Sequence, residues 1–291
     1  MRRILLTGSN GFVGQCVEKC APEDVTVFRL DIAPATAEAE RFFAADLSCC
    51  GSLSNLDPDF NGIIHLAGVS RVADGESDPM KCFQANLLGS IHIFEFARRH
   101  TISPWIILGS TIESPINMYG LSKRQMEQCA EIYSENHGLN ILSLRFSNIF
   151  GAPTDNQEKL IPILIKKALR NEKISINGPR QQVNIIPVTE VAKAIWCGAD
   201  YLRRQDSYFR ILDICGGQAL ERGELAKRIV ELAKSDSMIE FLDTDETSRS
   251  QNNHKDYFPD PTGALESLGF QSNLEIDDQL RNAIENYRRV L

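Results

Sequence analysis

The stretch Thr7-Gly8-Ser9-Asn10-Gly11-Phe12-Val13-Gly14 decides the fold of this chain. It follows a short apolar run typical of a buried strand, and it opens a segment, Phe12–Cys20, with the pattern of a helix. In such a turn Gly8 permits the tight bend, Gly11 lets a pyrophosphate approach the backbone, and Gly14 lets the helix pack closely on the strand. The helix N-terminus then presents free N–H groups and a positive dipole to the phosphates. A glycine turn can arise by chance, but this strand–turn–helix context predicts a dinucleotide site.

Strand and helix patterns alternate along the first half of the chain. Short apolar runs predict strands at Arg3–Thr7, Val25–Leu30, Phe42–Ala45, Gly62–Leu66, Trp105–Leu108 and Asn140–Phe146. Helical periodicity predicts helices at Phe12–Cys20, Met80–Arg99 and Tyr119–His137. Strands that alternate with helices indicate an α/β protein with a Rossmann-type, doubly wound parallel sheet.

The pattern changes after Gly151. Strand candidates at Lys173–Ile176, Val183–Ile186 and Tyr208–Cys215 mix with helix candidates at Lys159–Arg170, Val191–Leu202, Arg222–Ala233 and Ile276–Arg289. We therefore expect residues 1–151 to form the dinucleotide-binding domain and residues 152–291 to form a smaller, mixed α/β substrate lobe, with strands of the two parts free to interleave. The lobe would close over the carboxyl ends of the strands, where sheets of this kind bind ligands.

Composition limits the classes of function. The net charge of −8 argues against nucleic acid as a partner, and 43% hydrophobic and 24% charged residues are ordinary values for a soluble globular protein. The eight cysteines include no C-x-x-C pair, and we predict no metal site. The sequence shows no signal peptide and no apolar run long enough to span a bilayer, which favours a cytoplasmic protein without a membrane partner.

Asp31 follows the second predicted strand, at the distance from the glycine turn expected of the acid that accepts a hydrogen bond from the adenosine ribose. The plainer alternative is a loop aspartate at a strand end. A carboxylate in the ribose-binding position repels a 2′-phosphate, so the sequence favours NAD over NADP. Arg29 lies nearby, and we expect its side chain to project away from the site.

Tyr119 and Lys123 lie four residues apart and therefore share one face of their predicted helix. Taken alone, such a pair is more often an exposed aromatic residue and a solvated lysine. This pair follows the fifth strand, and Ser110 and Thr111 lie at the end of that strand. That context favours a proton-transfer group beside a nicotinamide.

Together these motifs resemble the extended short-chain dehydrogenases/reductases, of the NAD-dependent nucleotide-sugar epimerase/dehydratase family. The likeness covers nearly the whole chain and includes Thr7–Gly14, Asp46-Leu47, His65-Leu66-Ala67-Gly68, Asn86-Leu87-Leu88-Gly89, Tyr119-x-x-x-Lys123 and Leu144-Arg145-Phe146-Ser147-Asn148-Ile149-Phe150-Gly151. The resemblance implies that Thr111 takes the place of the family's catalytic Ser/Thr, that Tyr119 is the acid/base, and that Lys123 holds the nicotinamide ribose. For His65, a packed histidine at a strand end is a better account than a catalytic role.

The same resemblance implies the cofactor and substrate residues. It places Asp46 and Leu47 against the adenine, and Leu66–Gly68 beneath the phosphates and ribose. The full set implied for NAD is Gly8, Asn10, Gly11, Phe12, Val13, Gly14, Asp31, Ile32, Asp46, Leu47, Leu66, Ala67, Gly68, Asn86, Tyr119 and Lys123. The set implied for the substrate is Ser70, Thr111, Asn148 and Arg249, of which the last two would contact the diphosphate region.

Three departures from the family pattern matter. Eight positions separate Thr111 from Tyr119, where relatives usually carry a much longer loop, so one wall of the sugar pocket is reshaped. Short loops of this kind resemble those of deoxysugar enzymes in surface-polysaccharide pathways. The family's usual Arg-Asp pair is Val183-Asn184 here, so one expected phosphate contact is missing. The acid that follows the catalytic Thr in 4,6-dehydratases is replaced by Ile112, which argues against dehydration although Glu113 is present.

The resemblance leads us to expect a nucleoside-diphosphate-sugar 4-epimerase in which Tyr119, as phenolate, removes the proton of the sugar 4-hydroxyl while hydride passes from C4 to NAD. Free tyrosine has a pKa of about 10, so a base useful near neutrality needs a downward shift of about 3 units, or ~4 kcal/mol. Lys123 and the positive nicotinamide would supply that shift.

Two alternatives stay open. One is an NAD(P)H-dependent 4-keto-sugar reductase of deoxysugar biosynthesis, which would use the same residues and release its dinucleotide in each cycle. The other is a non-catalytic NAD-binding regulator. The intact set of Thr111, Tyr119 and Lys123 argues against the regulator, because a sensor needs no base.

The resemblance also leads us to expect a homodimer. In relatives, the helices that correspond to Met80–Arg99 and Tyr119–His137 pair with their symmetry mates. The apolar residues available here for such an interface include Ile91, Phe94, Met126 and Ile132. The alternative is that these residues pack on the chain's own sheet.

Overall fold

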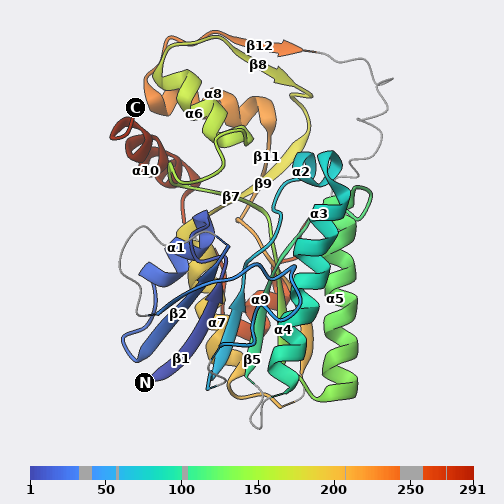
Figure 1. The fold of residues 1–291 in the computed structure, drawn as a ribbon. Helices are drawn as coiled ribbons and strands as arrows, with labels where there is room; N and C mark the ends of the chain where they lie inside the picture. The colour runs from blue at the N-terminus through green and yellow to red at the C-terminus, as the bar shows by residue number, and fades with distance from the viewer. Residues whose placement is uncertain (33–40, 57–58, 100–103, 207, 243–257, 273) are drawn as a thin grey trace.

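The computed structural model describes residues 1–32, 41–56, 59–99, 104–206, 208–242, 258–272 and 274–291. Its centre is a seven-stranded sheet in the order β10-β6-β5-β4-β1-β2-β3, in which every neighbouring pair is parallel (Figure 1). The strands are β1 (Arg2–Thr7), β2 (Val25–Asp31), β3 (Phe42–Ala44), β4 (Gly62–His65), β5 (Trp105–Thr111), β6 (Ile141–Phe146) and β10 (Phe209–Ile214). Strands up to β3 extend one edge and later strands extend the other, so the sheet is doubly wound as predicted, with its switch point between β1 and β4.

Helices cover both faces of this sheet, because residues along a strand alternate between the faces. On β1, Ile4 and Leu6 belong to one apolar cluster, and Leu5 belongs to a second cluster on the opposite face. Burial of each such side chain is worth about 1.5–3 kcal/mol. The first cluster includes residues of α1 (Phe12–Lys19), α7 (Val188–Leu202) and α9 (Thr262–Leu268). The second includes residues of α4 (Gly89–Arg98) and α5 (Met118–His137), the long helices on the right of Figure 1.

A smaller lobe lies beyond the carboxyl ends of the strands, at the top of Figure 1. It contains a three-stranded sheet in the order β11-β9-β7 and a parallel pair, β12 and β8, around an apolar cluster of its own. Its elements are β7 (Asn148–Phe150), α6 (Leu160–Leu169), β8 (Ile174–Asn177), β9 (Gln182–Pro187), β11 (Ala219–Glu221), α8 (Arg222–Ala233), β12 (Ile239–Leu242) and α10 (Ile276–Arg288). The chain enters this lobe with β7, directly after β6 and shortly before Gly151, where the sequence pattern changes.

The chain does not stay in the lobe. α7 packs against α1, and β10 pairs with β6 at the edge of the large sheet, although both elements follow residue 151. Leu212 and Ile214 of β10 belong to the same apolar cluster as Ile4. The division into residues 1–151 and 152–291 stays a prediction. In the structure, residues after 151 contribute both to the large sheet with its helices and to the smaller lobe.

The predicted strands and helices of the first half lie where their patterns placed them, with ends shifted by a few residues. The helix predicted at Met80–Arg99 is interrupted: it consists of α3 (Pro79–Phe83), a π-helical segment η1 (Gln84–Leu88) and α4. The sequence patterns missed the short elements α2 (Val72–Ser77), β7, β11, β12 and α9. Elements this short carry too few residues for a period to be visible.

Candidate active site

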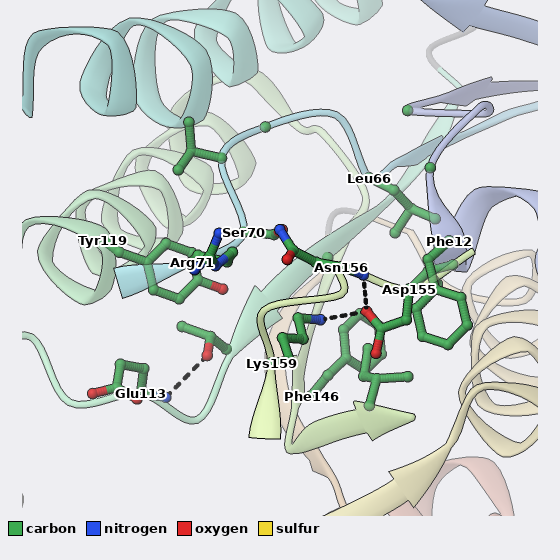
Figure 2. A pocket seen from close by; sticks show the side chains of 18 of the residues that line it. Phe12, Leu66, Ser70, Arg71, Glu113, Tyr119, Phe146, Asp155, Asn156 and Lys159 are labelled. Atoms are coloured by element: carbon green, nitrogen blue, oxygen red, sulfur yellow. Dashed lines mark hydrogen bonds and ion pairs between the residues drawn. The ribbon is translucent and has the colours of Figure 1, made fainter. Parts of the chain in front are cut away.

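A cavity of about 1050 Å³ lies between the carboxyl edge of the large sheet and the smaller lobe. Residues at the ends of β1, β2, β4, β5 and β6 line one side, and residues of β7, β9 and the first turns of α6 and α8 line the other. Figure 2 shows side chains from both parts of the lining close together: Phe12, Ser70 and Tyr119 follow strands of the large sheet, and Asp155 and Lys159 lie between β7 and α6 of the lobe. Open α/β sheets bind ligands at this edge, so the cavity is the candidate active site.

The glycine turn brings backbone against backbone at one end of the cavity. Gly8 has a φ of +69°, and a Cβ on it would lie 2.7 Å from the amide nitrogen of Ala67, just beyond β4. A Cβ on Gly14 would overlap the carbonyl oxygen of Gly8, so α1 approaches the turn this closely only because no side chain is there. The first turn of α1 lines the cavity without a side-chain cap, which leaves N–H groups for an anion.

Asp31, the last residue of β2, lines the cavity next to this turn. Its carboxylate accepts hydrogen bonds from the backbone N–H groups of Asn10 (2.9 Å) and Ile32 (2.8 Å), so it also ties the end of β2 to the glycine turn. Arg29 does not line the cavity and forms an ion pair with Glu18 at 3.6 Å, which confirms its predicted orientation. Arg29 therefore does not neutralise the carboxylate of Asp31.

Thr111, Tyr119 and Lys123 meet in the cavity wall at the end of β5. Thr111 is the last residue of β5, and its side chain hydrogen-bonds that of Tyr119. Asn117 caps α5 with its side chain and so fixes the start of the helix that carries Tyr119 and Lys123. The Lys123 ammonium donates a hydrogen bond to the carbonyl oxygen of Gly109 at 2.8 Å. The short Thr111–Tyr119 connection therefore still brings the three groups together.

Burial raises the pKa of Tyr119 to about 12. The hydrogen bond with Thr111 lowers this pKa, and the carboxylate of Glu113 raises it. In the chain by itself the burial of the phenol dominates, and Lys123 is bonded to Gly109. The downward shift expected from Lys123 together with a nicotinamide stays a prediction. Burial also lowers the pKa of Lys123, to about 8. A phenolate at this place needs further positive charge beside it.

The buried carboxylate of Glu127 connects α5 with β5 and β6, the elements next to these three residues. Glu127 on α5 is 2% exposed and accepts hydrogen bonds from the hydroxyls of Ser110 (2.8 Å) and Ser143 (3.0 Å). It also forms an ion pair with Arg145 at 2.6 Å. Ser110 belongs to β5, and Ser143 and Arg145 belong to β6. Loss of one partner of a buried ion pair costs about 3–5 kcal/mol, so this contact keeps α5 in register with both strands.

The cavity gathers most of the residues that the sequence singled out. Those in its lining are Gly8, Asn10, Gly11, Phe12, Val13, Gly14, Asp31, Ile32, Asp46, Leu47, Leu66, Ala67, Gly68, Ser70, Thr111, Tyr119, Lys123 and Asn148. Asn86 is the exception: it is fully buried behind Gly68 and donates to the hydroxyl of Ser122 at 2.9 Å, so it supports the wall instead of facing the cavity. Arg249 lies outside the residues that the structure describes.

His65 is a packed residue, as predicted. It is 2% exposed, and its ring nitrogens hydrogen-bond the hydroxyls of Thr7 (2.7 Å) and Ser90 (2.9 Å). Burial lowers the pKa of the ring to about 3, so the ring stays neutral at ordinary pH. The histidine therefore holds β1, β4 and α4 together.

Sequence reasoning missed a group of charged residues in the cavity wall. Asp155 is 4% exposed, burial raises its pKa, and it forms an ion pair with Lys159 at 3.0 Å (Figure 2). Arg71, which follows β4, forms an ion pair with Glu158 of the lobe at 2.6 Å. Arg222, the first residue of α8, also lines the cavity. No motif marks these residues, because distant loops and helix starts bring them together.

The residues present fit a dinucleotide. The glycine turn leaves no room for a side chain, the first turn of α1 is uncapped, and Asp31 and Asp46 lie in the same wall. Hydrogen bonds from Ser48 lower the pKa of Asp46 and keep its carboxylate charged. Among the residues described, no group of three or more His, Cys, Asp or Glu side chains could hold a metal ion. Across the same ranges of the chain, no helix is long and apolar enough to cross a membrane.

Known proteins resemble this chain in sequence and in fold. The sequence model of the NAD dependent epimerase/dehydratase family matches residues 4–209. A UDP-glucose 4-epimerase of Streptococcus mutans is 29% identical in an alignment of 210 positions. The alignment covers 60% of this chain and 63% of that protein, less than two thirds of its length. A solved UDP-glucose 4-epimerase of Thermotoga maritima, with UDP-glucose, has a TM-score of 0.85 at 20% identity and covers 99% of both chains. The Bordetella bronchiseptica enzyme WbmF, in complex with NAD+ and UDP, has a TM-score of 0.84 at 23% identity over 99% of this chain and 92% of its own. The two structural likenesses show a shared fold.

Gly14→Ala tests the close-packed turn. The added methyl group would overlap the Gly8 carbonyl, so we expect the free energy of unfolding to fall by about 1–3 kcal/mol and the affinity for NAD to fall at least about 10-fold. Chemical denaturation and calorimetric titration measure the two effects. Gly217→Ala is the matched control, because a Cβ there would meet only the Ser272 carbonyl oxygen at 3.7 Å. If both variants bound NAD equally well, the turn would not be the constraint described here.

Proposed function

The chain belongs to the NAD-dependent epimerase/dehydratase family, and from that premise we propose that it is a nucleoside-diphosphate-sugar 4-epimerase that works by transient oxidation at C4. The observation that carries the proposal is the presence of Thr111, Tyr119 and Lys123 in one cavity with the glycine turn. Reversible oxidation of an alcohol needs a proton-transfer group and a dinucleotide site on the same wall. The relatives named UDP-glucose 4-epimerase support a nucleotide sugar as the substrate class.

The residues of the cavity divide the chemistry among them. When bound, NAD supplies a reversible hydride acceptor. Tyr119 Oη, as phenolate, takes the proton of the sugar 4-hydroxyl as C4 is oxidised, and the Thr111 hydroxyl orients the same oxygen by a hydrogen bond. After the 4-keto sugar has turned in the cavity, Tyr119 returns the proton as C4 is reduced from the other face. The proton and the hydride both return to the sugar, so the cycle consumes nothing.

Asp31 favours the epimerase over the 4-keto-sugar reductase. An epimerase retains its NAD through the cycle, whereas a reductase must release the oxidised dinucleotide after each turnover and could use NADPH only if the site accepts a 2′-phosphate. The Asp31 carboxylate would repel the 2′-phosphate of NADPH, and Arg29 is paired with Glu18 outside the cavity lining. Ile112 lines the cavity where a dehydratase would carry an acid, which disfavours dehydration.

The cofactor content and the turnover of the purified protein test the proposal. We expect denaturation to release a stoichiometric amount of NAD, and the native protein to epimerise one of the UDP-, dTDP-, GDP- or CDP-sugars without added cofactor. A protein that emerges empty and consumes NAD(P)H stoichiometrically with a 4-keto sugar is a reductase, and the proposal is then wrong. A protein that retains NAD and turns over no nucleotide sugar is the regulator.

Tyr119→Phe tests the proton-transfer assignment. The variant keeps the ring that fills the wall and loses the hydroxyl, so we expect turnover to fall at least about 10²–10⁴-fold while NAD still binds. Tyr133→Phe is the control on the same helix, because its hydroxyl bonds Glu95 at 2.9 Å outside the cavity lining. A near-normal rate for Tyr119→Phe would sink the assignment.

A homodimer through α4 and α5 belongs to the same proposal, together with a cytoplasmic location and a role in polysaccharide biosynthesis. Ile132 is 53% exposed and Ile91 is partly buried, so both remain available for an interface. Phe94 and Met126 do not, because both are buried in the chain's own core, where the alternative placed them. A monomeric mass in solution at micromolar concentration would contradict the proposed dimer.

A further inference from the structure

Arg222 brings a guanidinium into the cavity wall, where no carboxylate of the described residues is paired with it. Its backbone N–H donates to the carbonyl oxygen of Gln181 at 3.0 Å, which places the residue beside the start of β9. Its Nε atom is buried and has no hydrogen-bond partner, and within the described ranges the side chain forms no ion pair. Burial lowers the pKa of Arg222, and no carboxylate in the same ranges counters this effect.

The other cations on the lobe side of the cavity are already neutralised. Arg71, which reaches the lobe from the sheet side, is paired with Glu158 at 2.6 Å, and Lys159 is paired with Asp155 at 3.0 Å. The remaining lysines of the lining are Lys81 of α3 and Lys123 of α5, on the sheet side, and Lys123 is bonded to the Gly109 carbonyl oxygen. Among the described residues of the lining, Arg222 is therefore the cation without an ion pair on the lobe side.

Arg222 is half-buried, and its buried Nε lacks a partner. Partial withdrawal of a guanidinium from water without a counter-ion is unfavourable, and an anionic ligand offsets that cost. The dinucleotide phosphates are expected at the glycine turn on the sheet side, whereas Arg222 stands on the lobe side of the same cavity. We propose that Arg222 binds the diphosphate of the nucleotide-sugar substrate and so determines that the substrate is a diphosphate ester. The inference rests on the proposed function.

The environment of β9 explains why the contact comes from α8. Val183, which stands where the family usually has an arginine, is 9% exposed and packs in the apolar cluster of the lobe. Asn184 exchanges two hydrogen bonds with the backbone of Gly216, at 3.0 and 2.9 Å, and so serves the fold. Leu220 pairs with Val183 across β11 and β9, and Arg222 follows two residues later. Arg222, directly after β11, thus supplies on the neighbouring strand the positive charge that β9 lacks.

Titration of the NAD-loaded protein tests the inference. The probes are UDP, dTDP, GDP and CDP, which carry the diphosphate without a sugar, and inorganic pyrophosphate, which also lacks the base. For the tightest probe we expect Arg222→Gln to raise the Kd at least about 10-fold, and Arg222→Lys to lie between that variant and the wild type. Arg281→Gln, on the 56% exposed arginine of α10, is the control and should leave the Kd unchanged.

A melting curve separates ligand binding from a structural role. Arg222→Met removes a half-buried charge that has no ion pair among the described residues, and the methionine side chain still fills part of its place. We therefore expect the free protein to melt at a higher temperature while the stabilisation by diphosphate is lost. A purely structural Arg222 would give a lower melting temperature and an unchanged Kd.

Each remaining outcome decides one proposal. An Arg222→Gln protein that binds the tightest probe as the wild type does overturns the inference, and so does a wild type that binds none of the probes. If no nucleotide sugar is epimerised but pyrophosphate binding still depends on Arg222, the anion site stands and the proposed function fails. If sugars are epimerised and Arg222→Gln leaves the KM unchanged, the function stands and the assignment of Arg222 is wrong.

Discussion

The contact of one backbone with another at Gly8 is the constraint on which the site depends. Because Gly8 has no side chain, the turn after β1 lies against Ala67 beyond β4, and Gly14 lets α1 start directly above that turn. The sheet register then aligns the ends of β1, β4 and β5, because Thr7 lies opposite His65 and His65 lies opposite Leu108 of β5. The dinucleotide turn and the end of β5, with Thr111, therefore come to the same edge of the sheet.

Burial controls the chemistry at that edge. It raises the pKa of Tyr119 and lowers that of Lys123, so each group alone is driven toward its neutral form. Tyr119 as phenolate and Lys123 as ammonium can both stay charged in a wall that excludes water only when each faces an opposite charge. Arg222, on the opposite side of the cavity, is half-buried and has no ion pair among the described residues, so it too is driven toward its neutral form. The cavity therefore favours ligands that bring charge: a cationic nicotinamide for Tyr119 and an anionic diphosphate for Arg222.

Local signals explain what could be predicted from the sequence. The glycine turn, the buried strands and the Tyr119–Lys123 pair each depend on residues close together in the chain, and the structure brings them to one cavity. The place of Asn86 behind Gly68 depends on a π-helical segment that the 3.6-residue period does not reveal. Arg222 lies at a predicted helix start, where an arginine is usually solvated. Its place in the cavity wall depends on the pairing of β11 with β9, and no pattern in the chain marks that pairing. The direction of the Tyr119 pKa shift likewise depends on desolvation by the assembled wall.

The fate of the C4 hydrogen tests the central claim most directly, which is that one cavity removes hydride from the sugar and returns it to the same molecule. The measurement mixes equal amounts of an unlabelled nucleotide sugar and the same sugar labelled with deuterium at C4 and with ¹³C throughout, and follows the epimer by mass spectrometry. Retention of NAD through the cycle predicts that deuterium stays with the ¹³C-labelled molecules. Deuterium on unlabelled product, or its loss to a dinucleotide in solution, would contradict the account.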